Sequence, residues 1–386
     1  MKLFVNGRKT VFKTLEQKIS KSDKTIWIHS ASLGEFEQGL PIIEELKKSY
    51  PNYKIIVSFF SPSGYEVKKN TPVADCVVYL PLDTKKNARK FIQLTKPELA
   101  IFVKYEFWPN YLHELQKTNT NTLLVSGIFR ENQIFFKFYG NWMRKSLQAF
   151  NHFFVQNIKS KKLLNSINYT NITVAGDTRF DRVTEILKRD NSLSFISDFK
   201  KDKTTIVYGS SWDDDEKIYL DFLNKSSNIK HIIAPHNINK TKIEKLKKSI
   251  KKPVILYSEL NNKNISEYDI FIVDTIGLLT KIYSYADIAY VGGAFKTGLH
   301  NVLEPAVFGI PVIIGPNYEK FQEAVELVAK NGVLSISSKK EYENILIQLT
   351  ENAGFRKSTG DINKLFIENQ SGATSKTIDY IQNELL

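Results

Sequence analysis

Val291-Gly-Gly-Ala-Phe-Lys-Thr-Gly-Leu-His-Asn-Val-Leu-Glu-Pro-Ala-Val-Phe-Gly-Ile-Pro-Val-Ile-Ile-Gly315 has the pattern of a strand end, a glycine turn, a helix start and a second strand. Gly292 and Gly293 let backbone approach a ligand where a Cβ would clash. Asn301 can cap a helix whose first turn carries Glu304. A carboxylate so placed can accept both hydroxyls of a ribose, while free N–H groups at helix starts face phosphate. The stretch favours a nucleotide site; an ordinary strand-loop-helix with a glycine turn is the alternative.

The composition places the chain among soluble globular proteins. Its 386 residues suffice for two domains, with 42% hydrophobic and 25% charged residues. The single cysteine, Cys76, excludes an internal disulfide and a cysteine zinc cluster. The net charge of +13 favours an anionic partner, which can be nucleic acid, a membrane surface or a phosphorylated substrate.

Short apolar runs alternate with longer helical stretches along the whole chain, which predicts doubly wound parallel sheets. We expect an amino-terminal Rossmann-like domain over residues 1–185 and a carboxy-terminal one over 186–386, facing each other across a cleft. The last helix is a candidate to pack back on the first domain. Asp181–Lys203 is polar and is the predicted linker. The predicted strands are Thr25–His29, Lys54–Phe59, Cys76–Leu80, Leu99–Val103, Thr122–Ser126, Phe153–Gln156, Ile172–Ala175, Thr204–Tyr208, His231–Ala234, Pro253–Tyr257, Ile270–Val273, Ile288–Val291 and Pro311–Ile314.

Two carboxylates follow strands of the first half. In His29-Ser-Ala-Ser-Leu-Gly-Glu35, Glu35 falls in a predicted first helical turn, where the macrodipole favours its ionised form and hence a role as base. A purely capping glutamate is the alternative. Pro41 lies inside the same pattern and predicts a late start or a kink. Glu106 follows the strand at Leu99–Val103 and could form an acid/base pair with Glu35 across one cleft.

Gly209-Ser-Ser-Trp-Asp-Asp-Asp-Glu216 allows two interpretations. Three acids after a serine fit a capped helix start better than a metal site, because no further hard ligands cluster nearby. Ser210 and Ser211 lie where a loop can donate to a phosphate. The six histidines show no metal-ligand spacing, so we expect neither a metal nor another cofactor.

The segment Gly127–Lys145 interleaves aromatic and basic residues. It can lie on lipid headgroups with its aromatic rings inserted and its cations on phosphates, or its aromatics can be core. The rings concerned are Phe135, Phe136, Phe138, Tyr139 and Trp142, and the cations are Arg130, Lys137, Arg144 and Lys145. No apolar run is long enough to span a bilayer, and the start lacks the apolar core of a secretion signal, which predicts a cytosolic or peripheral protein.

Several motifs, in order, resemble those of the Kdo (3-deoxy-D-manno-octulosonic acid) transferases, inverting two-domain glycosyltransferases of the GT-B fold. The resemblance runs from about Trp27 to Leu334. It rests on His29–Glu35, Glu106-Phe-Trp-Pro-Asn110, Gly176-Asp-Thr-Arg-Phe-Asp181, Gly209-Ser-Ser211, Asp274-Thr-Ile-Gly277 and Gly292 through Pro316. The family's proposed base matches Glu35, and the resemblance implies CMP-Kdo as donor.

The candidate binding residues fall into two groups. The donor group comprises Ser210, Ser211, His236, Ile276, Gly277, Gly292, Gly293, His300, Asn301 and Glu304. Within it we expect backbone N–H groups of Gly292 and Gly293 and the Ser210–Ser211 loop to stabilise the leaving phosphate, and Glu304 to hold the ribose. The acceptor and membrane group comprises Ser32, Gly34, Arg130, Lys137, Arg144 and Lys145. The chain departs from the family at Pro235-His236-Asn237, where Pro-Arg-His is common, so His236 would replace an arginine and its charge would depend on pH. Members commonly begin with an apolar membrane anchor, and this chain starts beyond it or lacks one.

The resemblance implies transfer of Kdo from CMP-Kdo to the lipid A precursor (lipid IVA), in lipopolysaccharide synthesis at the cytosolic face of the inner membrane. Other sugar-nucleotide enzymes of this fold, such as a lipid-linked glycosyltransferase or a nucleotide-sugar epimerase, are the first alternative. A basic nucleic-acid-binding protein is the second, but the sequence contains no recognisable nucleic-acid module. We therefore expect no nucleic-acid partner.

Overall fold

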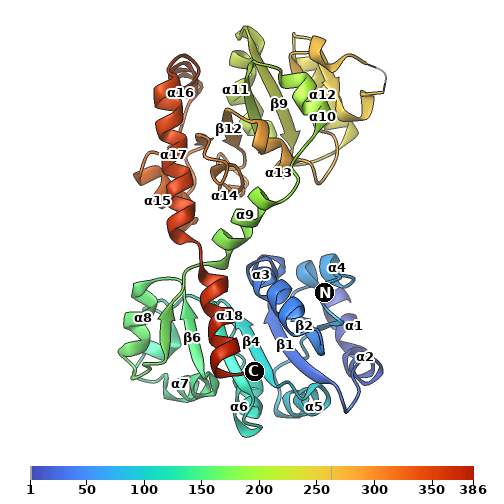
Figure 1. Cartoon of the computed structure of the whole chain (residues 1–386), viewed down its shortest axis with the longest axis vertical. Helices are drawn as coiled ribbons and strands as arrows, with labels where there is room; N and C mark the ends of the chain where they lie inside the picture. The colour runs from blue at the N-terminus through green and yellow to red at the C-terminus, as the bar shows by residue number, and fades with distance from the viewer. Residues whose placement is uncertain (1, 262) are drawn as a thin grey trace. The chain divides into compact units, whose positions relative to one another are not determined.

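The computed structural model describes residues 2–261 and 263–386, which form two compact units. The first unit contains the chain up to Arg182 together with Gln370–Leu386, and the second is Val183–Asn369 (Figure 1). The second unit therefore ends at Asn369, and the residues after it belong to the first.

The first unit contains one parallel sheet in the order β3-β2-β1-β4-β5-β6-β7. Its strands are β1 (Lys24–Ser30), β2 (Tyr53–Phe59), β3 (Cys76–Tyr79), β4 (Leu99–Val103), β5 (Asn121–Gly127), β6 (His152–Val155) and β7 (Ile172–Val174). Neighbouring residues of one strand enter cores on opposite faces: Trp27 packs with Phe102 on one side, and Ile28 with Val103 on the other. Burial on both faces explains why these strands are apolar throughout. The order reverses between β1 and β4, so the loops after these two strands flank the switch point.

Helices cover both faces of this sheet. One face carries α2 (Val11–Lys18), α5 (Lys85–Thr95) and α6 (Pro109–Lys117), and the other carries α3 (Leu33–Ser49) and α18 (Ala373–Glu384). The first unit also contains α1 (Lys2–Lys9), α4 (Pro62–Lys68), η1 (Ile134–Phe136), α7 (Asn141–Ser146), η2 (Leu147–Ala149) and α8 (Ile158–Asn165). Because α3 begins at Leu33, well before Pro41, the late start predicted from that proline is wrong.

The second unit repeats this architecture, with the order β10-β11-β9-β8-β12-β13-β14. Its strands are β8 (Thr204–Ser211), β9 (Ile229–Pro235), β10 (Val254–Leu256), β11 (Ile270–Ile272), β12 (Ile288–Val291), β13 (Val312–Ile314) and β14 (Val333–Ser335). Its switch point lies between β8 and β12, which pair in parallel. The prediction of doubly wound parallel sheets is confirmed, although β14 was not predicted.

The helices of the second unit complete it. They are α10 (Ser194–Lys200), α11 (Asp213–Lys225), α12 (Lys240–Ser249), η3 (Tyr257–Glu259), η4 (Ile265–Glu267), α13 (Leu279–Ile282), η5 (Tyr283–Tyr285), α14 (Leu303–Ala306), α15 (Gln322–Ala329), α16 (Lys339–Glu351) and α17 (Ala353–Gln370). The predicted linker Asp181–Lys203 lies at the unit boundary, although most of it is helical. It contains most of α9 (Thr178–Lys188), within which the unit boundary falls, and all of α10.

Helix α18 lies within the first unit (Figure 1) and is anchored there by Asp181 of α9. The Asp181 carboxylate accepts hydrogen bonds from Gly372 N at 2.5 Å, Thr374 N at 2.6 Å and Thr374 Oγ1 at 2.7 Å. Ile378 and Ile381 are buried in the core that α3 contributes to. Asp181, part of one of the sequence motifs, thus has a structural role at the start of α18.

Candidate functional site

Glu35 lies where the sequence predicted it, in the first turn of α3 and directly after β1. Its side chain is largely buried, with 7% of the residue exposed. The Ser32 hydroxyl donates a short hydrogen bond to Glu35 Oε2. Gly34, between them, has no close neighbour that a Cβ would strike, so the glycine is not needed for packing. The position combines a fixed carboxylate with a helix start at the carboxyl end of the sheet.

Glu106 lies in the loop after the neighbouring strand β4, where Trp108 donates to it and His29 lies nearby. Its Oε2 accepts from Trp108 Nε1 at 3.0 Å and lies 3.5 Å from His29 Nε2. His29 is fully buried, and its Nδ1 is 2.9 Å from Ser58 Oγ, which also accepts from Trp27 Nε1 at 2.8 Å. The Trp108 indole also donates to His29 Nε2 at 2.9 Å, so this one N–H group contacts both His29 and the second carboxylate. The sequence analysis gave neither Trp108 nor His29 an individual role.

Tyr105 connects the two carboxylates electrostatically. Burial raises the pKa of its phenol, the charges of Glu35 and Glu106 raise it further, and the Arg130 guanidinium opposes them. The Arg130 guanidinium carbon lies 5.8 Å from the centre of the Tyr105 ring. Lys104, before it, has a left-handed backbone with φ of 73°, a strained conformation for a residue with a Cβ. The predicted carboxylate pair therefore lies at one edge of the first sheet, with Arg130 close by.

The glycine turn after β12 does not offer the phosphate donors that we predicted. Gly292 N donates to Gly209 O at 2.9 Å, and Gly293 N donates to Asp215 Oδ2 at 2.9 Å. A Cβ on Gly292 would lie 2.5 Å from Ser210 O and 2.8 Å from Asp215 Oδ2. The glycine thus serves close packing between the turn and the end of β8. Because both N–H groups are already bonded, their assignment to a phosphate is wrong.

The loop after β8 is also only partly available for contact with a ligand. Ser211 is only 2% exposed, so its predicted donation to a phosphate is not supported. Its Oγ accepts a hydrogen bond from Tyr219 OH at 3.2 Å. Ser210 is half-buried with a left-handed φ of 53°. The acidic run starts α11, as the preferred interpretation held: Asp213 pairs with Lys242 and Asp215 accepts from Trp212 N.

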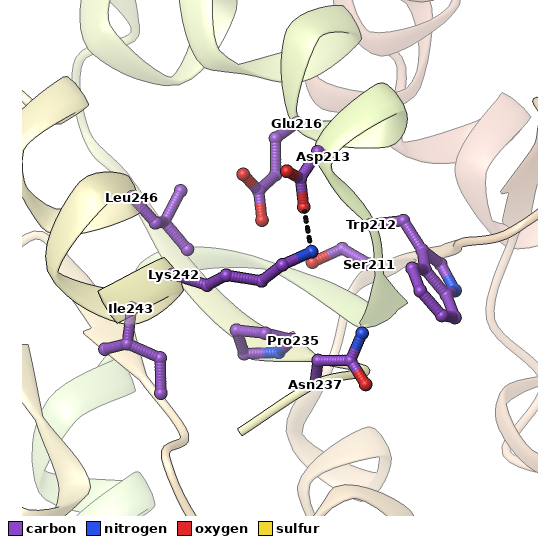
Figure 2. Close-up of a pocket in the computed structure, with 9 residues that line it drawn as sticks. All are labelled: Ser211, Trp212, Asp213, Glu216, Pro235, Asn237, Lys242, Ile243 and Leu246. Atoms are coloured by element: carbon purple, nitrogen blue, oxygen red, sulfur yellow. Dashed lines mark hydrogen bonds and ion pairs between the residues drawn. The ribbon is translucent and has the colours of Figure 1, made fainter. Parts of the chain in front are cut away.

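Ser211 also lines a small pocket beside α11 and α12. Figure 2 shows Lys242 extending toward the carboxylates of Asp213 and Glu216. Burial, with help from Asp213, raises the pKa of Glu216 to about 7. The pocket volume of about 10 Å³ is close to that of one water molecule and far below the several hundred Å³ of a small-molecule site. We therefore do not assign the donor to it.

Three aromatic rings meet at the carboxyl edge of the second sheet. The His236 ring stacks on Trp212 with 4.4 Å between centroids and on His300 with 4.5 Å. Trp212 Nε1 donates to His300 Nε2 at 3.0 Å, so the proton of neutral His300 is on Nδ1. Burial, and then the neighbouring His236, lower the pKa of His300 to about 4. His300 is thus a neutral N–H donor near pH 7, beside the exposed ring of His236.

Glu304 lies in α14, near the switch point of the second sheet, and both of its carboxylate oxygens accept hydrogen bonds. They accept from Thr280 Oγ1 and Asn301 Nδ2, each at 3.1 Å. Asn301 also caps the helix start by accepting from Leu303 N at 3.0 Å, as predicted. However, α14 has only four residues, so its start is a weaker phosphate site than a full helix.

Ile276 and Gly277 occupy the loop between β11 and α13, the helix that carries Thr280. Ile276 is 88% exposed, and Gly277 has a left-handed φ of 95°. Asp274, before them, accepts from Ser258 N at 3.0 Å and from Ser258 Oγ at 2.5 Å. This carboxylate therefore fixes the loop, and Ile276 is left open to solvent.

The aromatic and basic segment divides into buried and exposed parts. Phe138, Tyr139 and Trp142 are 94%, 58% and 59% exposed, whereas Phe135 is 2% exposed and packs against Phe107 with 4.8 Å between centroids. Phe135 is therefore core, and its predicted insertion into lipid is wrong.

The cations of this segment differ as well. Arg144 is half-buried and its Nη2 donates to Lys137 O at 2.9 Å, so it ties the loop rather than facing outward freely. Lys137 itself is half-buried, while Arg130 and Lys145 are exposed. Lys145 and Trp142 line a groove of about 310 Å³ beside α6.

Within the described residues no helix is long and apolar enough to cross a bilayer. Residues 2–261 and 263–386 also contain no cluster of three His, Cys, Asp or Glu side chains suited to a metal.

Comparisons with known proteins agree with this architecture. The family model described as 3-deoxy-D-manno-octulosonic-acid transferase (kdotransferase) matches residues 7–182. A 3-deoxy-D-manno-octulosonic acid transferase of Aquifex aeolicus is 29% identical over 334 residues, covering 84% of this chain and 85% of that protein. A bifunctional glycosyltransferase/methyltransferase of Fusobacterium nucleatum is 30% identical over 390 residues, which are 96% of this chain and 58% of that protein. This chain thus spans little more than half of the Fusobacterium relative.

One solved structure supports the fold class. A UDP-GlcNAc 2-epimerase from Neisseria meningitidis, bound to UDP-GlcNAc, is 14% identical and has a TM-score of 0.65. The match covers 94% of this chain and 100% of that chain. At this identity the likeness shows a shared fold of the GT-B class and says nothing of the substrate.

Proposed function

The chain belongs to the Kdo transferase family and is a glycosyltransferase, and on that premise we propose that it transfers Kdo from CMP-Kdo to a hydroxyl of the lipid A precursor, with inversion. The observation that carries the proposal is the position of Glu35. A buried carboxylate fixed by Ser32 at a helix start, at the switch point of the first sheet, is suited to accept a proton from an attacking hydroxyl.

The proposed reaction is a single displacement. The acceptor oxygen attacks the anomeric carbon of Kdo as its proton passes to Glu35. The bond from that carbon to the phosphate oxygen breaks, and CMP leaves as a phosphate monoester anion. Glu106, held by Trp108 and placed near His29, lies at the same edge and orients the acceptor through hydrogen bonds. Arg130 supplies positive charge beside Tyr105 for the anionic acceptor.

On the donor side we assign Glu304 and Asn301 to the ribose. Their polar groups already form one hydrogen-bonded pair, which a ribose would join. The phosphate contact passes to His300 and His236, because the N–H groups of the glycine turn are bonded within the protein. We further propose that the reaction needs no metal or other cofactor, so that turnover persists in EDTA.

The protein would bind an anionic membrane peripherally, at the cytosolic face of the inner membrane. The exposed rings of Phe138, Tyr139 and Trp142, together with exposed Lys145, support this docking face. Nucleic acid is not a proposed partner. The net charge of +13 instead fits the phosphates of CMP-Kdo, of the lipid A precursor and of anionic lipid.

The direct test is the product mass after incubation with CMP-Kdo and a tetra-acylated lipid A precursor. The expected result is a mass increase of one or more Kdo units with release of CMP. Glu35→Gln keeps the size of the side chain but removes the base, so turnover should fall about a hundredfold or more while CMP affinity stays unchanged. Glu45→Gln on the same helix, where Glu45 forms an ion pair with Lys48, is the matched control. Undiminished turnover of Glu35→Gln would remove Glu35 from the mechanism.

A further inference from the structure

Asp215 is a buried carboxylate that bridges three segments of the second unit. It belongs to the first turn of α11, directly after β8, and is 1% exposed. Its Oδ2 accepts from Trp212 N and from Gly293 N, both at 2.9 Å. Its Oδ1 accepts from Tyr290 OH at 2.8 Å. One side chain therefore connects the loop after β8, the end of β12 and the glycine turn.

All three partners of Asp215 are donors, which suits an ionised carboxylate. Burial raises the pKa of Asp215, and the hydrogen bonds from Gly293, Tyr290 and Trp212 oppose that rise. A buried carboxylate that lost such partners would be strongly unfavourable, so the contacts are mutually dependent. The acidic run looks uniform in sequence, but Asp213 and Asp214 form ion pairs with Lys242 and Lys217 instead.

The contacts of Asp215 close into a ring that includes the proposed donor-binding histidine. Trp212 is bonded to Asp215 through its backbone and to His300 Nε2 through its indole. His300 N donates to Gly292 O at 3.2 Å, and the next residue, Gly293, is bonded to Asp215. The carboxylate thus fixes both ends of the Trp212–His300 hydrogen bond. His236 stacks on these two rings and depends on the same arrangement.

We propose that Asp215 is the positioning residue of the donor site: by joining the loop after β8 to the glycine turn, it sets the Trp212, His236 and His300 rings for the nucleotide. This inference rests on the proposed function, since it takes CMP as the nucleotide. Asp215 itself is too buried to touch the donor. It acts through Trp212 and His300.

The test is CMP binding by isothermal titration calorimetry, which needs no acceptor and no turnover. Asp215→Ala removes all three contacts and should raise the Kd for CMP at least tenfold. Asp215→Asn should remain within about threefold of wild type, because its amide oxygen can accept both backbone N–H groups while its NH2 donates to Tyr290 OH. Tyr290→Phe removes the one contact outside the ring and should bind CMP normally. In steady-state assays the donor KM should rise in Asp215→Ala while the acceptor KM stays constant.

A purely structural role gives a different pattern. Asp215→Ala would then lower the melting temperature, yet well below that temperature it would bind CMP within twofold of wild type, and this result would overturn the inference. If Asp215→Ala does not fold, Trp212→Phe tests the same ring of contacts from its other side, because it removes the indole N–H bonded to His300. A folded Trp212→Phe protein with wild-type CMP affinity would equally overturn it. Wild-type protein that binds UDP and not CMP would refute the proposed donor, and the same variants would then be measured with UDP.

Discussion

Phe135 and Phe138 make a matched pair that separates membrane docking from core packing. Phe138 is 94% exposed, so Phe138→Ser should change the free energy of unfolding by less than about 0.5 kcal/mol. Phe135 is 2% exposed and packs against Phe107 and Phe129. Phe135→Ser should therefore destabilise the first unit by about 3–5 kcal/mol, the range for removing a buried aromatic ring.

For lipid binding the order of the two substitutions should be reversed, with Phe138→Ser having the larger effect. A phenylalanine ring buries about 150–250 Å² when fully removed from water, which at about 25 cal/mol per Å² is about 4–6 kcal/mol. A ring inserted only halfway contributes about 2–3 kcal/mol, so Phe138→Ser should weaken binding to anionic vesicles by roughly 30–150-fold. Lys145→Glu should weaken it further, because a basic residue near such a surface contributes about 1 kcal/mol.

The assay is co-sedimentation with anionic vesicles, with zwitterionic vesicles as control, and circular dichroism melting of each variant. A short water-soluble acceptor analogue should still be used by Phe138→Ser, since the proposed proton transfer to Glu35 does not involve Phe138. A folded Phe138→Ser protein with unchanged vesicle binding would refute the docking face. An unchanged melting temperature for Phe135→Ser would refute the packing argument.

Two further predictions concern stability. Asp181→Ala removes the acceptor for three hydrogen bonds at the start of α18, so in urea unfolding it should destabilise the first unit by about 2–4 kcal/mol. The control Asp379→Ala, at an exposed position of α18, should change the free energy of unfolding by less than about 0.5 kcal/mol. His231 is fully buried, and burial lowers its pKa to about 3. Between pH 6.5 and pH 3 the unfolded chain therefore binds a proton that the folded protein does not. The free energy of unfolding should fall by about 1.4 kcal/mol for each pH unit in this range. Urea midpoints at pH 7 and 5 measure this loss, and a slope that His231→Gln leaves unchanged would contradict it.

Much of the fold follows from sequence because buried parallel strands are short apolar runs, and several of them, such as β1, β5 and β12, end in or are followed by glycine or serine. β14 escaped prediction although β7, with the same length and the same burial pattern, was predicted, so neither property explains the difference. The helical character of the linker segment Asp181–Lys203 also escaped prediction. Its charged residues are equally compatible with the exposed faces of surface helices, and composition does not distinguish these from loops.

The site was predictable in part. Glu35 and Glu106 follow neighbouring strands, so topology alone brings them to one edge. Burial within irregular segments has no periodicity, which is why Phe135 and Phe138 looked equivalent. Gly292 and Gly293 indicated a close approach of backbone, but the sequence does not say that the approaching group is Asp215 rather than a ligand.

The return of α18 to the first unit has a consequence for how the chain folds as it is made. Ile378 and Ile381 complete a core that otherwise comes from residues synthesised before Arg182. Roughly 190 residues of the second unit are translated in between, which takes about 10–40 s at the usual rate of synthesis. During that time the apolar face of α3 lacks its partner. On the ribosome the first unit is therefore finished after the second, and until then its exposed apolar face is prone to aggregation.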